Sequence, residues 1–397
     1  MPGMPATVIF PDGEPRPAAS APRSRRPSSP VRRILFPLVA LTLALVTACG
    51  VVELGLRICG YGRNYTNPMG SFFEPDGDLG YHGKANFAGR FRREDFDVVV
   101  EHDENGFRRN ESPIDRAARQ DVYVLGDSFV WGYGVGQHDL LTNQMQRRLG
   151  GRRVHNLGLI GAGTLQEYLL FQKYVLDRLR PGDTVVLVFF NNDFGDNIGR
   201  NFRGRVYATI DNGQVRLVPP PPASTMRQWK NRMKDASYLF NLVTYCLDCF
   251  QINRNAKNVG DRATRLVPPP DQIRADTCDS GPAVRVTRHY MSEFSTACRA
   301  KQVRFLVAYV PGQAELGEDE VTSTSDLSLP EEIACRHAFD RMVRDLAIEA
   351  VDLMPSMVAA KRAGRFDRMT FAHDFHWNPA GHTIAAETIA AAITQEK

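Results

Sequence analysis

Short apolar runs alternate with amphipathic stretches along most of the chain. The runs are rich in valine, phenylalanine and tyrosine, which suit buried strands, and they predict strands at 122–125, 153–156, 184–190, 303–310 and 351–353. Apolar positions at helical spacing predict helices at 140–149, 165–179, 284–300 and 338–348. Strands that alternate with helices and have apolar cores indicate an α/β fold, with a parallel sheet covered on both faces.

The first 52 residues follow another pattern. Residues 1–33 contain eight prolines and six arginines against two acids, so we expect a disordered tail that buries too little apolar surface to fold. Residues 34–52 are nineteen uncharged residues, and a helix of that length spans a hydrocarbon core of about 30 Å. The arginines on the tail side predict a single-pass anchor in the cytoplasmic (inner) membrane, with the tail in the cytoplasm. The rest of the chain would then be extracytoplasmic, in the periplasm of a cell with two membranes.

A cleaved secretory signal is the alternative for the apolar run. Val46-Thr47-Ala48-Cys49 resembles a bacterial lipoprotein cleavage site. The long leader and the length of the run favour an uncleaved anchor, because a signal core usually has about 7–15 residues. With either interpretation, the body of the protein is tethered to a membrane outside the cytosol.

The formal net charge of +4 comes entirely from the tail, since 43 basic and 43 acidic residues follow residue 33. This balance gives no reason to expect nucleic-acid binding. The sequence has no metal-ligand cluster, phosphate-binding glycine loop or dinucleotide fingerprint, so we predict no metal and no cofactor.

The pattern of apolar and polar positions divides the region after the anchor into two parts. Residues 53–104 are expected to form a stalk or small annex, and residues 105–397 a single catalytic domain. Within that domain the alternation lapses at about 199–282, where proline runs at 219–222 and 268–270 flank a predicted amphipathic helix at 226–250. An insertion here is a candidate for substrate recognition, and the alternative is a surface excursion with no contact to ligand.

One motif carries the strongest chemical signal. The strand 122–125 runs directly into Gly126-Asp127-Ser128-Phe129, so the sequence predicts a sharp turn that presents Ser128 at the start of a helix. A serine hydroxyl attacks an acyl carbon only when a neighbouring base accepts its proton, and the reaction needs donors for the oxyanion.

The candidate base lies near the end of the chain. Asn378 and Pro379 are typical of an N-cap and a first helical position, which places His376 on the loop before a terminal helix. Asp374 lies two residues before His376 and would point the same way in an extended stretch, so it is the candidate that orients the imidazole.

Two segments offer oxyanion donors, 156–163 and 190–193. Each follows a predicted strand, as Ser128 does, and the carboxyl ends of parallel strands meet at one edge of a sheet where ligands bind. We expect Gly158 and Gly163 to be turn glycines, His382 to be structural, and Trp131 and Trp377 to pack in the core rather than contact sugar.

With these pieces together, the chain resembles the SGNH subgroup of the GDSL hydrolases, from about Asn105 to the C-terminus. The resemblance implies a three-layer, flavodoxin-like fold and a serine nucleophile, Ser128, whose backbone N–H is one oxyanion donor. It also implies that Gly161 donates through its backbone and Asn192 through its side chain. The segment Asn105-Gly106-Phe107-Arg108 is similar to one that precedes the first block in membrane-anchored bacterial members.

The last block departs from the common pattern, because its Asp and His are two residues apart instead of three. Asp374-Phe375-His376-Trp377 is similar to the corresponding segment of the alginate O-acetylation proteins. The resemblance implies a serine esterase for O-acyl, most simply O-acetyl, esters of carbohydrate or cell-envelope polymer. An O-acyltransferase and a non-catalytic carbohydrate-binding or assembly protein are the alternatives. For a lipase or thioesterase we would expect a hydrophobic lid, and the proline-rich, charged insertion gives little sign of one.

The cysteine count permits disulfide bonds in an exported chain. Outside the apolar run there are six, Cys59, Cys246, Cys249, Cys278, Cys298 and Cys335, and spacing does not give their connectivity. Cys246 and Cys249 form a C-x-x-C pair without ligand partners at zinc spacing. We interpret the pair as a local bridge or as two free thiols.

Overall fold

The computed structural model describes residues 30–59, 72–111, 119–198, 204–220, 222, 225–244, 246–247, 281–318 and 329–395. The predictions for most of the tail, for Cys249 and Cys278, and for the proline run at 268–270 lie outside these residues.

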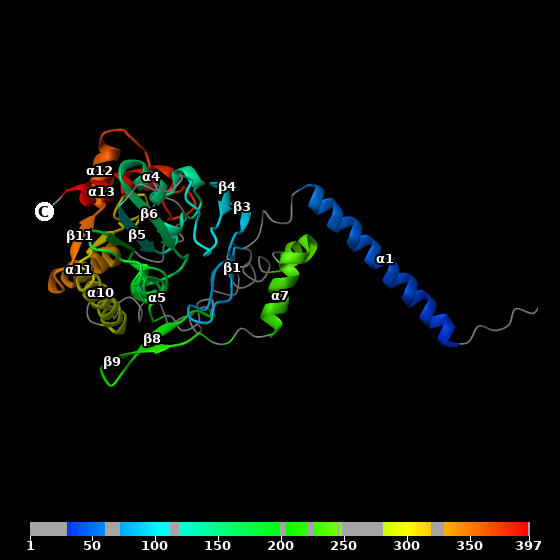
Figure 1. Cartoon of the computed structure of the whole chain (residues 1–397). Coiled ribbons are helices and arrows are strands. Elements are labelled where there is room, and N and C mark those ends of the chain that lie inside the picture. The colour runs from blue at the N-terminus through cyan, green and yellow to red at the C-terminus, as the bar shows by residue number, and fades with distance from the viewer. Residues whose placement is uncertain are drawn as a thin grey trace, which may run out of the picture. The chain divides into compact units, whose positions relative to one another are not determined.

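A five-stranded parallel sheet forms the centre of the body (Figure 1). Its strands are β5 (Gln120–Gly126), β6 (Arg152–Gly158), β7 (Thr184–Phe189), β10 (Arg304–Tyr309) and β11 (Glu349–Asp352). Every predicted strand is present. The order across the sheet is β11-β10-β7-β5-β6, and all neighbours are parallel. This is the flavodoxin-like order, so the predicted α/β class and three-layer fold are confirmed.

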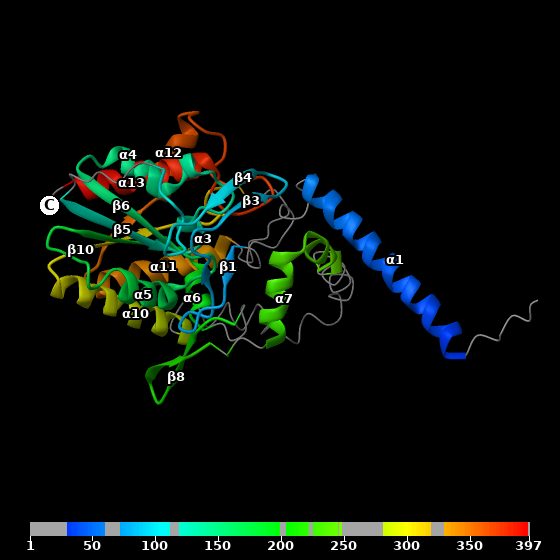
Figure 2. The same ribbon diagram turned by 45° about the vertical axis from the view of Figure 1, so that its right-hand side comes forward.

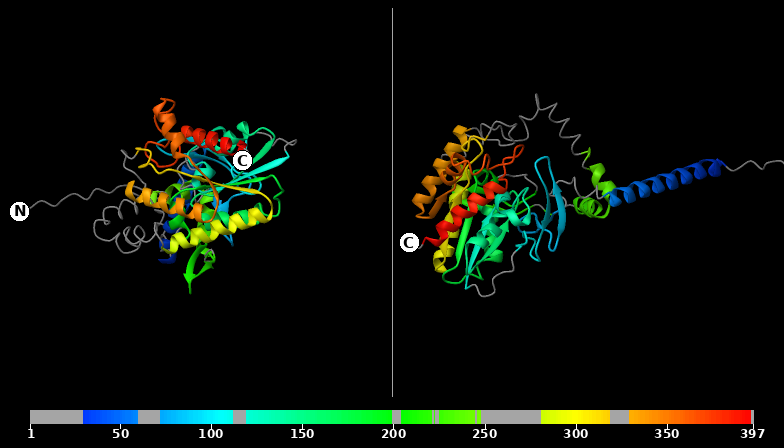
Figure 3. Two further views of the ribbon diagram at one scale, coloured as in Figure 1. Left: turned by 90° about the vertical axis from the view of Figure 1, so that its left-hand side faces the viewer. Right: turned by 90° about the horizontal axis from the view of Figure 1, so that it is seen from above.

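Helices cover both faces of the sheet, as Figure 2 shows. One layer contains α4 (Leu141–Arg148), α12 (Met354–Arg362) and α13 (Pro379–Thr394), and the other contains α5 (Thr164–Tyr174), α10 (Pro282–Ala300) and α11 (Leu329–Asp345). The left view in Figure 3 again separates α13 from α10. Because side chains alternate along a strand, Val122 and Val124 pack in one core cluster while Tyr123 and Leu125 pack in the other.

Helix α11 begins at Leu329, earlier than the predicted start at residue 338. Its first turn contains Pro330, Glu331 and Glu332. Proline suits the first helical positions and acidic side chains are stabilised by the helix N-terminus, so polar residues extend this helix beyond its apolar stripe.

The annex consists of two antiparallel pairs that share the core of the body. The strands are β1 (Phe73–Glu74) with β2 (His82–Gly83), and β3 (Ala88–Arg92) with β4 (Asp97–Glu101). The rings of Phe72, Phe73 and Phe91 surround Trp131, with centroid distances of 6.1, 5.8 and 6.4 Å. Trp131 and Trp377 are fully buried, as core packing predicts.

The region predicted as an insertion contains a hairpin and a helix. Strands β8 (Tyr207–Asp211) and β9 (Gln214–Val218) pack beside α10, and α7 covers Thr225–Ala236. The predicted single helix at 226–250 is wrong, because α7 ends at Ala236 and helical structure resumes at Tyr238. The hydroxyl of Ser237 accepts from Phe240 N at 3.1 Å, as an N-cap of a new helix does.

Helix α1 (Pro30–Ile58) contains the predicted anchor. An 18-residue window within Ile34–Ile58 has a mean hydropathy of 2.4, and this is the one helix among the described residues that is long and apolar enough to cross a membrane.

The described cysteines differ in state. Cys49, Cys59, Cys246 and Cys298 are free, so Cys246 does not form a local bridge with Cys249. Cys335 is disulfide-bonded.

The last residue of β6 needs to be glycine for packing, which corrects the expectation of a turn glycine. A methyl group at Gly158 would lie 2.1 Å from the backbone nitrogen of Trp131. We therefore expect Gly158→Ala to lower the free energy of unfolding by about 3 kcal/mol through overpacking, measured by denaturant unfolding. Gly136→Ala is the control, because nothing lies within 4 Å of the added carbon and φ is −71°. Equal stabilities of the two variants would contradict this account.

Candidate active site

Ser128 lies at a sharp turn where β5 ends. Helix α3 (Ser128–Trp131) follows β5 at once, and Asp127 caps it by accepting from Phe129 N at 2.9 Å. Asp127 therefore holds the turn by accepting from a backbone N–H.

The structure brings Ser128 and His376 together. The Nε2 atom of His376 lies 2.7 Å from Ser128 Oγ, and its Nδ1 atom hydrogen-bonds Asp374. Asp374 also accepts from the backbone N–H of His376 at 3.0 Å. Burial raises the pKa of Asp374, but the imidazole and these hydrogen bonds outweigh it, so the pKa is lowered and the carboxylate stays ionised.

Two aromatic rings, which the sequence argument missed, fix the plane of the imidazole. His376 stacks on Tyr133 at a centroid distance of 4.1 Å and on Phe375 at 4.2 Å. Tyr133 follows Ser128 closely in the sequence and Phe375 is adjacent to His376. Their closeness in sequence to Ser128 and His376 was the signal that could have indicated these two rings.

The loop that carries His376 is held at its two ends. Asn378 caps α13 by accepting from Ala380 N at 2.8 Å and Gly381 N at 3.1 Å, as its sequence predicted. At the other end, the buried carboxylate of Glu318 accepts from Met369 N and Thr370 N. No sequence pattern pointed to Glu318.

The segment predicted to supply Gly161 forms a tight turn past the end of β6. Gly161 has φ +68°, which favours glycine. The backbone N–H groups of Gly161 and Ser128 donate to no other atom of the described residues. Both remain available to a ligand, as oxyanion donors must be.

Asn192 begins α6 (Asn192–Asp196), directly past the end of β7. Its Nδ2 donates to Asp127 at 3.1 Å and to Asp196 at 3.3 Å. The predicted oxyanion role would require one of these N–H groups to leave its carboxylate when substrate binds. The long contact to Asp196 is the weaker of the two.

Four acidic side chains gather behind this edge of the sheet. Burial raises the pKa of Asp127 to about 6. Burial, and then the charges of neighbouring acids, raise the pKa values of Glu167 and Asp193 well above their ordinary values, with Asp196 among those neighbours. Asp193 accepts from the Thr164 hydroxyl at 3.3 Å. Like charges in a dry site favour protonated forms.

Arg108, from the segment that resembles the membrane-anchored members, supports the turn after Ser128. Its guanidinium donates to the carbonyls of Trp131 at 3.3 Å, Gly132 at 3.1 Å and Val135 at 3.1 Å. Burial lowers the pKa of Arg108 to about 9. Arg108 thus satisfies carbonyl groups at the end of α3, which a short helix leaves without partners.

The two other histidines near the C-terminus lie outside this hydrogen-bonded group. His382 accepts from Leu141 N at 3.2 Å, and burial lowers its pKa to about 3, consistent with a structural role. His373 is exposed and pairs with Asp95 at 2.8 Å. The described residues contain no group of three or more acidic, histidine or cysteine side chains that could hold a metal ion.

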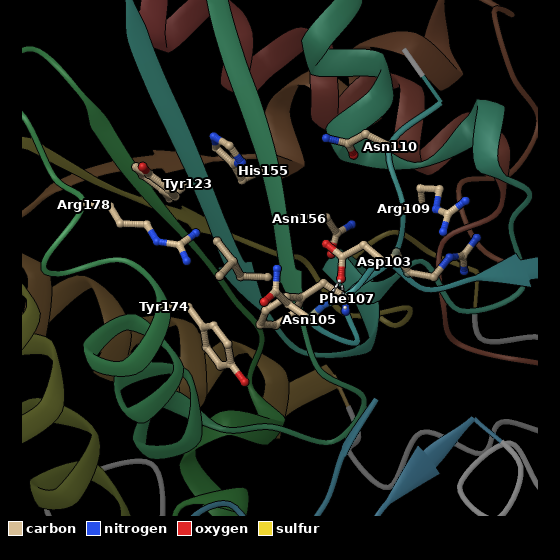
Figure 4. A pocket seen from close by; sticks show the side chains of 12 residues that line it. Asp103, Asn105, Phe107, Arg109, Asn110, Tyr123, His155, Asn156, Tyr174 and Arg178 are labelled. Atoms are coloured by element: carbon tan, nitrogen blue, oxygen red, sulfur yellow. Dashed lines mark hydrogen bonds between the residues drawn. The ribbon is translucent and has the colours of Figure 1, made fainter. Parts of the chain in front are cut away.

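A separate cavity of about 190 Å³ lies beside β5 and β6 (Figure 4). Tyr123 and His155 stack in its wall at a centroid distance of 4.8 Å, and Asn105 and Phe107 line it from the preceding segment. Neither Ser128 nor His376 lines this cavity.

The fold and the Ser128–His376–Asp374 arrangement define the class of an SGNH-like α/β protein with the geometry of a serine hydrolase. Residues 273–397 match the family model described as "SGNH hydrolase-like domain, acetyltransferase AlgX". The match confirms the resemblance to the SGNH hydrolases and to the alginate acetylation proteins, over the part of the chain that contains His376 and Asp374. A comparison with curated proteins found no match.

Solved structures of a lipolytic protein and of esterases are also similar to the chain. A lipolytic protein of the G-D-S-L family from Veillonella parvula DSM 2008 is 11% identical, with 70% of this chain and 100% of that chain covered and a TM-score of 0.39. The acetyl xylan esterase AlAXEase is 12% identical, with coverages of 68% and 98% and a TM-score of 0.37. A putative arylesterase from Agrobacterium tumefaciens str. C58 is 10% identical, with coverages of 69% and 98% and a TM-score of 0.37.

The buried acids predict a pH-dependent stability. A folded-state pKa above the ordinary 4.5 means that folded Glu167 keeps a proton that the unfolded chain has lost, so stability falls as pH rises above that value. We expect Glu167→Gln to raise the melting temperature at pH 8 and to leave it nearly unchanged at pH 4. Calorimetry with Glu74→Gln, an exposed strand position, as control tests this. A lower melting temperature for Glu167→Gln at pH 8 would refute it.

Proposed function

We propose that the protein is a membrane-tethered, extracytoplasmic serine esterase that removes acyl groups, most simply acetyl, from carbohydrate or cell-envelope polymer. The observation that carries the proposal is the 2.7 Å contact between Ser128 Oγ and His376 Nε2, with Asp374 on the far side of the imidazole. The match over residues 273–397 to a family of acetyltransferase domains supports the choice of acyl group.

The proposed reaction has two steps. His376 accepts the proton of Ser128 as the hydroxyl attacks the ester carbonyl, and then delivers it to the departing alcohol. Asp374 stabilises the imidazolium in between. The oxyanion is held by the N–H groups of Ser128 and Gly161 and by the side chain of Asn192. Water then attacks the acyl-enzyme as His376 takes its proton, and His376 returns that proton to Ser128 Oγ as the bond to the acyl group breaks and the acid leaves.

A second candidate is acyl transfer to a sugar hydroxyl. One observation favours it, because the matched family is named for an acetyltransferase. In this reaction the sugar hydroxyl replaces water, and His376 accepts its proton.

The proposed location follows from α1. We propose that it crosses the cytoplasmic membrane once, with the arginine-rich tail inside and the esterase domain outside. The disulfide at Cys335 supports an oxidising compartment, which the periplasm provides.

Removal of the nucleophile tests the proposal. We expect a fluorophosphonate probe to label the wild type and to leave Ser128→Ala unlabelled. Hydrolysis of 4-nitrophenyl acetate should fall by about 10⁴-fold or more, because the acyl-enzyme cannot form. Ser295→Ala, at a buried serine on α10, is the matched control and should be labelled normally. Equal labelling of Ser128→Ala and wild type would exclude Ser128 as the nucleophile. A wild type that neither reacts nor hydrolyses the ester would instead favour the non-catalytic binding protein.

An assay with and without an oligosaccharide acceptor distinguishes hydrolysis from acyl transfer. With 4-nitrophenyl acetate alone, we expect an esterase to release many equivalents of nitrophenol for each enzyme molecule. A transferase would release a single burst and turn over only with an oligosaccharide present, and mass spectrometry would then find the acetylated sugar. A burst that needs an acceptor to continue would overturn hydrolysis as the main reaction.

A further inference from the structure

The turn that carries Gly161 has the geometry of a type II turn. Residues Leu159 to Ala162 form a four-residue turn, closed by Ala162 N donating to Leu159 O at 3.0 Å. Gly161 occupies the third position with φ +68°, as a type II turn requires. Types I and II differ by a flip of the central peptide, which here joins Ile160 to Gly161. The C=O and N–H of a planar trans peptide point in opposite directions, so this flip would reverse the Gly161 N–H.

A tyrosine from the annex holds this peptide. The hydroxyl of Tyr81 donates to the carbonyl oxygen of Ile160 at 2.6 Å, and the contact is buried. This carbonyl belongs to the same peptide as the Gly161 N–H. The hydrogen bond therefore favours one flip state and aims the N–H away from Tyr81.

Arg205 supports the same turn from a second segment. Its guanidinium donates to the carbonyl oxygen of Gly161 and to Asp196 at 2.6 Å, and it also hydrogen-bonds the Tyr81 hydroxyl. The arginine side chain is about 1% exposed. The carbonyls of Ile160 and Gly161, on either side of the Gly161 N–H, thus both accept hydrogen bonds from side chains outside the central sheet.

The segment that contains Tyr81 packs against the segment that contains Arg205. Val206 N donates to Leu79 O at 3.1 Å, and a methyl group at Gly80 would lie 2.3 Å from the carbonyl oxygen of Gly204. Such close backbone contact fixes the position of Tyr81 relative to Arg205. The annex and the segment before β8 therefore form one support for the Gly161 turn.

We infer that Tyr81 is a positioning residue that sets the direction and donor strength of the Gly161 N–H, with Arg205 as its partner. The inference rests on the proposed function, in which this N–H binds the oxyanion. Donation to the carbonyl of a peptide also polarises its N–H, so Tyr81 strengthens the donor as well as directing it.

The test compares Tyr81→Phe with wild type in the full chain in detergent micelles. We expect kcat for 4-nitrophenyl acetate to fall roughly tenfold, less than the 10²–10³-fold typical for loss of an oxyanion donor. KM should stay within about twofold, because the donor acts mainly on the transition state. The rate of fluorophosphonate inactivation should fall by a similar factor, while the pH profile keeps its shape because His376 is untouched.

Tyr309→Phe is the matched control, since its buried hydroxyl has no hydrogen-bond partner among the described residues. It should leave kcat and inactivation within about twofold of wild type. If Tyr81→Phe does not fold, Arg205→Lys is tested instead. Lysine keeps the positive charge but lacks the forked guanidinium that donates to both Gly161 and Asp196.

The outcomes separate this inference from the proposed function. An active wild type whose Tyr81→Phe variant keeps full kcat, or shows only a lower melting temperature, overturns the inference alone. A wild type without labelling or turnover overturns both. A parallel loss of kcat and of inactivation rate, at unchanged KM, supports the inference.

Discussion

The hydrogen bond between Ser128 and His376 joins residues 248 positions apart, and the arrangement of the sheet makes it possible. Ser128 begins a helix at the carboxyl end of β5, next to the point where the strand order reverses. His376 reaches the same place because Asn378 starts α13 there. A parallel sheet gathers strand ends at one edge, so the chain can build a site from distant segments.

The pKa values of the carboxyl groups near the carboxyl edge of the sheet are shifted in opposite directions. Asp374 accepts two hydrogen bonds from His376, which keep its pKa low despite burial. Burial raises the pKa values of Asp127, Glu167 and Asp193, and the charge of His376 offsets this only in part at Asp127. The low pKa keeps Asp374, the acid beside the imidazole, ionised, which suits the stabilisation of a transient imidazolium. The raised pKa values of Glu167 and Asp193 predict that their ionisation costs stability as pH rises.

The parts of the chain outside the sheet contribute to the site by holding backbone. Arg108 satisfies carbonyls of the turn after Ser128, and Glu318 accepts from two amides of the loop before His376. Tyr81 and Arg205 hold the carbonyls around Gly161. Each of these side chains is buried and hydrogen-bonded to main chain, so the geometry of Ser128, His376 and Gly161 depends on residues outside the hydrogen-bonded group.

The sequence by itself determined the features that local patterns encode. Valine-rich runs gave the five strands, the Gly126–Ser128 turn gave the candidate nucleophile, and Asn378 with Pro379 gave the start of the last helix. Each depends on neighbours within a few positions, so periodicity and capping rules suffice to find it.

Tertiary structure decided the rest. It broke the helix predicted at 226–250, required Gly158 for backbone packing, turned Asn192 toward Asp127, and brought Tyr81 to the Gly161 turn. These outcomes depend on contacts between segments far apart in the chain. Such contacts leave no period or spacing in the sequence, because any residue of suitable size and polarity can make them once the fold brings the segments together.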